Sequence, residues 1–304
     1  MTDQSGLVIR ALPVPPAIML AHVAQNPALA ATFGDVDFRV WPNSDAMKED
    51  LAAGKVDLCV IPTNTAAGLF NQGRPIRLLG VTVWGILHVL TNRPDCRSWP
   101  DLKGRRIAVP FKGNMPDTIF RLLAGKNGFQ PDRDFDLAYQ PNYVAARNTL
   151  LAGNADAACL PEPVASSTIH EARLQSKDVR RMMDLQQEWA QAFNGPPRYA
   201  QAGPVINTRV LDLYTDAVTI LQKAIETAVA FMKDQPDAAG RLGEPFLGGL
   251  PASVIADALK ATENRAGWFP ESREAVNDFL RKLMDVSPDL VPGGLPSDDF
   301  WVKK

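Results

Sequence analysis

Two charged side chains occupy positions where they could contact the charged or polar groups of a small ligand. Glu162 lies between Pro161 and Pro163, directly after an apolar run that predicts a strand, and Lys112 lies in the loop FKGNMPD, just before a predicted helix. A carboxylate fixed in this way favours an ammonium, an amidine or a ring N–H group, and the lysine favours an anionic group. The alternatives are a structural salt bridge for Glu162 and a solvated loop lysine for Lys112.

Patterns typical of catalysis are missing from the sequence. It contains no GxSxG elbow, no HExxH helix and no glycine-rich fingerprint with the flanking elements that a dinucleotide needs. The three histidines are scattered and the three cysteines form no CxxC motif, which argues against a zinc site. Cys59 and Cys159 lie in apolar runs, typical of small buried thiols. We therefore predict no catalytic residue, no metal and no cofactor.

Composition indicates a soluble globular protein. Of 304 residues, 46% are hydrophobic and 22% are charged, and the net charge of −2 does not favour nucleic acid or an anionic membrane as a partner. No stretch of about 18 apolar residues predicts a membrane span. Asp3 stands where a signal peptide would carry basic residues, so we expect LVIRAL (7–12) to be the first strand of the mature fold. The sequence is compatible with a signal peptide that was removed and with a protein that never had one.

The most informative feature is an internal repeat. LAAGKVDLCVIPTN (51–64) and LLAGNADAACLPEP (150–163) share residues at a constant offset of 99, and Pro42, Asn43 and Ala46 match Pro141, Asn142 and Ala145 at the same offset. Identities that keep register in this way indicate two copies of one supersecondary unit.

Each copy reads as strand, helix, strand, helix, strand. The expected strands are 7–12, 36–41 and 56–62 in the first copy and 104–110, 135–139 and 155–161 in the second. Asn43 or Ser44, Asn114 and Asn142 are expected to cap helices that end near Ala53, Asn127 and Gly153. This alternation predicts an α/β fold with two lobes, each built on a mixed, mostly parallel sheet flanked by helices.

Two β-rich segments are expected to connect the lobes. They are 77–94 and 198–210, and the residues after Leu211 are mostly helical in pattern and are expected to pack on the first lobe. We place lobe one at 1–88 and 204–304, lobe two at 89–203, and hinge strands at about 84–92 and 200–207. The lobes are expected to move as near-rigid bodies about these strands.

In open α/β sheets, ligands bind beyond the carboxyl ends of the strands, so the loops that follow the predicted strands form the candidate site. Their hydroxyls, amides, aromatic faces, one lysine and one carboxylate suit a small polar or zwitterionic organic molecule with a flat part. The aromatic residues have a core position as their alternative, and residues 63–65 an alternative role in capping the next helix. The candidate ligand-binding residues are Pro15, Trp41, Asn43, Thr63, Asn64, Thr65, Trp84, Lys112, Gly113, Asn114, Met115, Asn142, Tyr143, Glu162 and Tyr199.

The segment SWPDLKGRRIAVP (98–110) is similar to the W-x-DLKGK-x-IAV segment of type II periplasmic solute-binding proteins of ABC importers, in the nitrate, sulfonate, taurine and thiamine-precursor (NMT1/THI5-like) branch. LLAGNADAACLPEP resembles the L-x-x-G-x-x-DA…EP segment of that branch, and FKGNMPD lies in the place of its ligand-contacting loop. The resemblance covers about residues 7–210 and is looser in the C-terminal helices.

The resemblance implies a receptor that captures a sulfonate, carboxylate or pyrimidine-like solute in a cleft between two lobes. Its partners would be the solute and the membrane subunits of an ABC importer, without nucleic acid and without insertion into the membrane. A periplasmic, monomeric, non-enzymatic protein is expected. The alternative is a cytoplasmic enzyme on the same scaffold, such as a chorismate dehydratase-like lyase or a desulfinase, which gains if the gene encodes no signal peptide.

Overall fold

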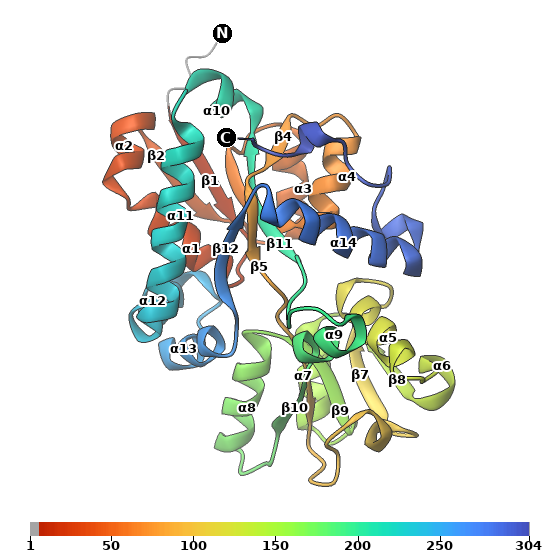
Figure 1. Ribbon diagram of the computed structural model, residues 1–304. Helices are drawn as coiled ribbons and strands as arrows, with labels where there is room; N and C mark the ends of the chain where they lie inside the picture. The colour runs from red at the N-terminus through yellow and green to blue at the C-terminus, as the bar shows by residue number, and fades with distance from the viewer. Residues whose placement is uncertain (1–5, 304) are drawn as a thin grey trace. The chain divides into compact units, whose positions relative to one another are not determined.

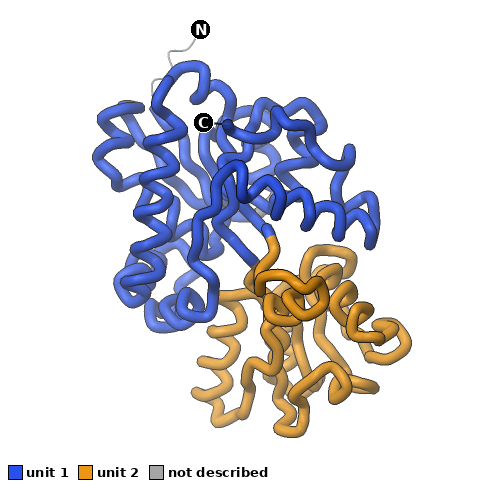
Figure 2. The backbone as a smooth tube through the Cα atoms, viewed as in Figure 1, with its two compact units in different colours: residues 1–84, 200–304 blue, residues 85–199 orange. Residues whose placement is uncertain are grey.

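The computed structural model describes residues 6–303, which pack into two compact units. The residues up to Trp84 and from Ala200 onward form unit 1, and Gly85–Tyr199 form unit 2 (Figure 2). The chain thus leaves unit 1 after Trp84 and returns after Tyr199, and the C-terminal helices belong to unit 1. Rigid-body movement about the two crossing segments stays a prediction.

Unit 1 contains one mixed sheet. Its strands are β1 (Leu7–Ala11), β2 (Val36–Val40), β3 (Leu58–Pro62), β4 (Ile76–Leu78), β5 (Gly80–Val83), β11 (Ala202–Asn207) and β12 (Asn264–Trp268). The order is β12-β5-β11-β3-β1-β2, with β4 also paired to β11. β1 is parallel to β2 and β3, whereas β11 is antiparallel to β3, β4 and β5, and β12 is antiparallel to β5. β4 and β5 therefore run in the direction of β1, and in the described part of the sheet only β11 and β12 oppose it.

Unit 2 is built in the same way around a smaller sheet. Its strands are β6 (Leu87–Thr91), β7 (Arg106–Pro110), β8 (Asp136–Gln140), β9 (Ala157–Pro161) and β10 (Arg180–Asp184). The order is β10-β6-β9-β7-β8, where β7 is parallel to β8 and β9, and β6 is antiparallel to both β9 and β10. The two mixed, mostly parallel sheets predicted from the sequence are confirmed.

Helices flank both sheets (Figure 1). In unit 1 they are α1 (Pro16–Ala24), α2 (Pro27–Phe33), α3 (Ser44–Ala52), α4 (Thr63–Asn71), α10 (Thr208–Leu213), α11 (Ala217–Asp234), α12 (Pro236–Gly243), α13 (Ala252–Lys260) and α14 (Glu271–Val286). Unit 2 carries α5 (Met115–Lys126), α6 (Pro131–Asp134), α7 (Tyr143–Leu151), α8 (Val164–Leu174) and α9 (Leu185–Phe193). Short 3-10 turns are η1 (Trp99–Leu102), η2 (Glu244–Phe246), η3 (Pro288–Leu290) and η4 (Asp298–Phe300).

The sequence repeat is a structural repeat. α3 and α7, and likewise β3 and β9, have bounds that differ by the same offset of 99 residues. The order β3-β1-β2 in unit 1 corresponds to β9-β7-β8 in unit 2, each next to an antiparallel strand. Both helices are followed by a glycine with positive φ, Gly54 at 64° and Gly153 at 74°, a conformation that other residues adopt at a cost.

Several elements differ from the sequence prediction. β3 begins at Leu58 rather than at residue 56, because Val56 and Asp57 precede the ladder. The helical run expected from Leu211 breaks at Tyr214, whose extended backbone ends α10 before α11 begins. β12, with the sequence NRAGW, was not predicted, since it lacks the β-branched residues that mark a strand.

The core of unit 2 fixes the direction of its strand side chains. Leu90, Ala108, Ala158 and Leu160 pack with residues of α7 and α8 in one buried cluster. Because side chains alternate along a strand, the residue two positions after Leu160 is directed to the same helices. That residue is Glu162, which brings a carboxylate to the buried start of α8.

Candidate functional site

Apart from Tyr199, the predicted residues of unit 2 follow β7, β8 and β9 at the carboxyl edge of the sheet. The loops after β7 and β8 are neighbours, because Phe111 N–H donates to the Gln140 carbonyl at 2.9 Å and the Phe111 ring packs edge-on against Tyr143 at 5.0 Å. Phe111 has a φ of 55°, an unusual backbone for a bulky residue. This backbone conformation of Phe111 was not predicted, since nothing local in the sequence marks it.

The buried carboxylate of Asp117 lies at the helix start after β7. Asp117, only 3% exposed, accepts from Gly113 N–H at 2.8 Å and from the Tyr139 hydroxyl at 3.2 Å. Asn114 occupies the N-cap position of α5, but its side chain makes no capping hydrogen bond, so that part of the sequence prediction is wrong. Asp117 occupies the place that an anionic ligand group would compete for.

Exposed polar groups surround this helix start. Lys112 is exposed, with its ammonium 4.9 Å from the centre of the Tyr139 ring. Burial, followed by the negative charge of Asp117, raises the pKa of Tyr139. Gly113 and Asn114 are also exposed, and Met115 is half-buried. Ligand contact by these four residues stays a prediction.

Asn43 and Asn142, which the repeat relates, perform the same local task in their units. Asn43 Oδ1 accepts from the N–H groups of Asp45 and Ala46 at 3.0 and 2.9 Å, and Asn142 Oδ1 accepts from Ala145 N–H at 2.8 Å. The predicted helix caps are therefore confirmed. Tyr143 follows Asn142, and burial raises the pKa of its phenol to about 12.

The large aromatic candidates are buried, and each donates its polar hydrogen to protein. Trp41 Nε1 donates to Asp50 at 2.8 Å, Trp84 Nε1 donates to the Arg265 carbonyl at 3.1 Å, and the Tyr199 hydroxyl donates to Gln186 at 3.2 Å. All three are at most 3% exposed. These contacts are those of the alternative interpretation, a place in the core.

The residues after β3 make hydrogen bonds to other segments of unit 1. Thr63 is fully buried, with its hydroxyl donating to the Ala200 carbonyl at 2.7 Å and its N–H to the Gln201 carbonyl at 2.9 Å. Asn64 donates to the Leu290 carbonyl at 2.9 Å. Its Oδ1 is buried without a partner among the described residues. Thr65 is half-buried, and Pro15 is buried at the N-cap position of α1.

Glu162 is the most highly connected of the candidates. Its carboxylate is completely buried and pairs with Arg181, whose Nη2 and Nε donate to Oε1 at 2.5 and 3.1 Å. Oε2 accepts from Ser166 N–H at 3.1 Å, in the first turn of α8. The structural salt bridge, which was the alternative for Glu162, is thus present, and a direct ligand contact stays a prediction. Arg181 lies 19 residues away on β10, so sequence spacing gave no signal for the pair.

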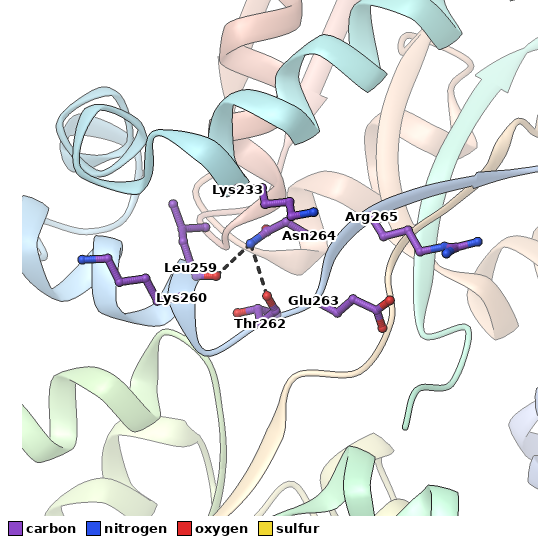
Figure 3. A pocket seen from close by; sticks show the side chains of 7 residues that line it. All are labelled: Lys233, Leu259, Lys260, Thr262, Glu263, Asn264 and Arg265. Atoms are coloured by element: carbon purple, nitrogen blue, oxygen red, sulfur yellow. Dashed lines mark hydrogen bonds between the residues drawn. The ribbon is translucent and has the colours of Figure 1, made fainter. Parts of the chain in front are cut away.

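A separate cavity of about 540 Å³ lies in unit 1 at the carboxyl ends of α11 and α13 (Figure 3). Asn264 closes one side by donating to the carbonyls of Leu259 and Thr262. The positive charge of the cavity is partly neutralised, because Lys260 pairs with Asp237 and Arg265 pairs with Glu271. The cavity contains none of the predicted residues, and it is lined by Lys233, Leu259, Lys260, Thr262, Glu263, Asn264 and Arg265.

The cysteines and the possible metal ligands of residues 6–303 form no metal-binding group. Cys59, Cys96 and Cys159 are free and buried, as predicted for the first and last, and burial raises the pKa of Cys59 to about 12 and that of Cys159 further. No group of three or more His, Cys, Asp or Glu side chains in the described chain could hold a metal ion. In the same residues, no helix is long and apolar enough to cross a membrane.

Comparison with known proteins identifies the fold. A crystal structure of an ABC transporter from Parabacteroides distasonis is similar over 99% of this chain and 100% of its own, with a TM-score of 0.80 and 23% identity. The periplasmic aliphatic sulphonate binding protein SsuA from Escherichia coli is similar over 98% and 96%, with a TM-score of 0.74 and 18% identity. The periplasmic nitrate-binding protein NrtA from Synechocystis PCC 6803 is similar over 94% and 82%, with a TM-score of 0.62 and 14% identity.

The sequence comparison is consistent with these structures. No curated protein matches the chain at a significant level. The NMT1-like family model matches residues 23–180, just over half of the chain, and includes both copies of the repeated strand-helix-strand segment. The resemblance found in the sequence is therefore confirmed: the chain has the type II periplasmic-binding-protein fold and belongs to the NMT1-like family.

Proposed function

We propose that the chain is the substrate-binding component of an ABC importer, and that it captures a small polar organic solute at the carboxyl edges of its two sheets. The observation that carries the proposal is the repeated edge itself. In both units a capped helix follows β2 or β8, and a buried residue, Thr63 or Glu162, follows the third parallel strand. This is where open α/β sheets bind ligands.

Family membership and the structural neighbours support this role. The similar structures include proteins named for binding sulphonates and nitrate, which makes a sulfonate, a carboxylate or a pyrimidine-like compound a reasonable class of solute. In this proposal the protein acts as a monomer in the periplasm, and its other partners are the membrane subunits of the importer. The side chains at the unit 2 edge, which include Lys112, Asn114 and Tyr143, suit a molecule with both polar and flat parts.

A screen of compounds by thermal shift tests the proposal. The panel contains alkanesulfonates, carboxylates, pyrimidines, flavins and amino-acid-like compounds. A ligand at 100 times its Kd adds about 2.7 kcal/mol to the free energy of unfolding, which gives a clear rise in Tm. Calorimetry on each hit should then give one bound solute per chain. A panel without a single hit, with binding absent by calorimetry as well, would count against the proposed role.

A further inference from the structure

Unit 2 contains a buried group of ionisable side chains around Glu162, and of these the proposed function uses only Glu162 itself. Glu162 is paired with Arg181, and Arg181 Nη2 also donates to Ser166 Oγ at 2.7 Å. His88 lies beside this pair on β6, with Nε2 3.7 Å from the same Glu162 oxygen that Arg181 holds. Asp184, at the end of β10, is the cross-strand neighbour of His88.

The imidazole of His88 makes no hydrogen bond to the described part of the chain. Its side chain is 3% exposed, and neither ring nitrogen has a hydrogen-bond partner among the described residues. The distance of 3.7 Å to Glu162 exceeds that of a hydrogen bond. A buried polar group without a partner is uncommon and costs free energy, which calls for a second state in which the group is satisfied.

The surroundings keep His88 neutral near pH 7. Burial lowers the pKa of His88 and is the largest effect, while the negative charges of Glu162 and Asp184 raise it and the positive charge of Arg181 lowers it. With a neutral imidazole, Arg181 is the cation that holds Glu162. Uptake of one proton from solvent places a second cation next to the same carboxylate oxygen.

We propose that protonation of His88 changes the partner of Glu162 from Arg181 to His88. The exposure of the two cations decides the direction of the exchange. Arg181 has a side chain that is 33% exposed and can turn toward water, whereas His88 and Glu162 are enclosed. Closing the gap from 3.7 Å to the 2.7–2.9 Å typical of a charged N–H···O bond needs a shift of about 1 Å.

Hydrogen bonds connect the surroundings of His88 to both ends of unit 2, near Gly85 and at Tyr199. Glu162 N–H donates to the Ile86 carbonyl at 2.9 Å. Gln186 accepts from Leu87 N–H at 3.1 Å and from the Tyr199 hydroxyl at 3.2 Å, and its amide donates to Asp184 at 2.7 Å. The residues around His88 are thus linked to Ile86 by one hydrogen bond from Glu162, and to Leu87 and Tyr199 by way of Gln186, which donates to Asp184. If the proposed function holds, solute affinity changes as the pH falls through this step; that consequence, unlike the exchange itself, rests on the proposed function.

Nuclear magnetic resonance on the wild-type protein without solute tests the exchange directly. The Cε1–H resonances of the histidines give their titration curves, and the Nε–Hε resonance of Arg181 reports its bond to Glu162. We expect His88 to titrate below its ordinary value of about 6.5 and the Arg181 resonance to shift with the same midpoint. An Arg181 resonance that stays unchanged while His88 titrates overturns the proposal, as does a His88 that takes up no proton before the protein unfolds.

Two variants separate the exchange from general acid sensitivity. His88→Gln keeps a neutral polar side chain, and we expect the pH-dependent shift of Arg181 to disappear; His170→Gln, on α8, is the matched control and should keep it. Because the folded state lowers the pKa of His88, its contribution to stability is complete above 6.5 and is lost as the pH falls. The unfolding constant of the wild type should then rise relative to His88→Gln by at most about tenfold per pH unit. A shift of Arg181 that persists in His88→Gln overturns the proposal, and failure of the solute screen alone leaves it standing.

Discussion

Asp57 and Asp156 hold equivalent positions in the two units, 99 residues apart, and make the same pair of contacts. Asp57 Oδ2 accepts from Val8 N–H at 2.9 Å and from Arg209 Nη2 at 2.7 Å. Asp156 accepts from Arg106 N–H at 3.0 Å and from Arg93 Nε at 2.5 Å. Each carboxylate therefore joins the start of the third parallel strand to the start of the first and also pairs with an arginine. The repeated aspartate therefore has a structural role in both units.

Although the two positions are equivalent, we expect the loss in free energy of unfolding to differ when each charge is removed, because the paired arginines differ in exposure. Asp57→Asn should lower the free energy of unfolding by about 3 kcal/mol, because it removes the buried negative charge that pairs with Arg209 at 2.7 Å. Asp156→Asn should cost about 1–2 kcal/mol, since its arginine is half exposed and keeps its hydration. Urea unfolding at neutral pH measures both. Equal losses in the two variants would show that burial does not set the difference.

Asp156 also gives a pH dependence with a definite sign. Burial raises the pKa of Asp156, but the N–H of Arg106 and the charge of Arg93 outweigh it and hold the pKa below 3.8. A lowered carboxyl pKa stabilises the fold fully above the unfolded value and progressively less as the pH falls toward the folded value. The difference in stability between the wild type and Asp156→Asn should therefore shrink below about pH 4, as measured by urea unfolding from pH 7 to pH 3. A constant difference would contradict this.

Gly85, the first residue of unit 2, should tolerate no side chain. Its φ is 93°, and a Cβ there would lie 2.6 Å from Gln186 Cγ and 2.8 Å from Oε1. Gly104 has a similar φ of 71° but open space around it, so Gly104→Ala measures the backbone strain alone, about 1–2 kcal/mol. We expect Gly85→Ala to lower the Tm clearly more than Gly104→Ala. Equal shifts would mean that Gln186 moves away without cost.

Lys112 should matter only if the solute carries an anionic group. Lys112→Ala is then expected to weaken binding by about 1–3 kcal/mol, the range for a hydrogen bond to a charged group, and added salt should weaken the wild type more than the variant. Lys126→Ala, at the other end of α5, is the control. Calorimetry with the identified solute at two salt concentrations decides the point. Identical affinities of wild type and variant at both would place the ligand away from this loop, whose Gly113 N–H already donates to Asp117.

The sequence predicted those features that local chemistry or the repeat determines. Asn43 and Asn142 were predicted as caps because an amide at that position satisfies free N–H groups within a few residues. The partner of Glu162 was not predictable, because β10 brings Arg181 next to β6 only in the folded sheet. His88 could not be singled out from the sequence either, since its lack of a hydrogen bond depends on neighbours from β10 and from the segment after β9. The backbone of Phe111 likewise follows from the packing of two loops rather than from its own residue type.

We propose that the protein binds a small solute and returns it unchanged. Incubation of the protein with a solute found by the thermal-shift screen tests this claim. Saturating solute and protein are held together for hours, the protein is then unfolded, and the released compound is compared with the starting material by mass spectrometry and proton resonance. We predict one equivalent of chemically identical solute per chain. Recovery of a converted product, formed by the wild type and absent from a boiled control, would contradict the claim and identify an enzyme on this scaffold.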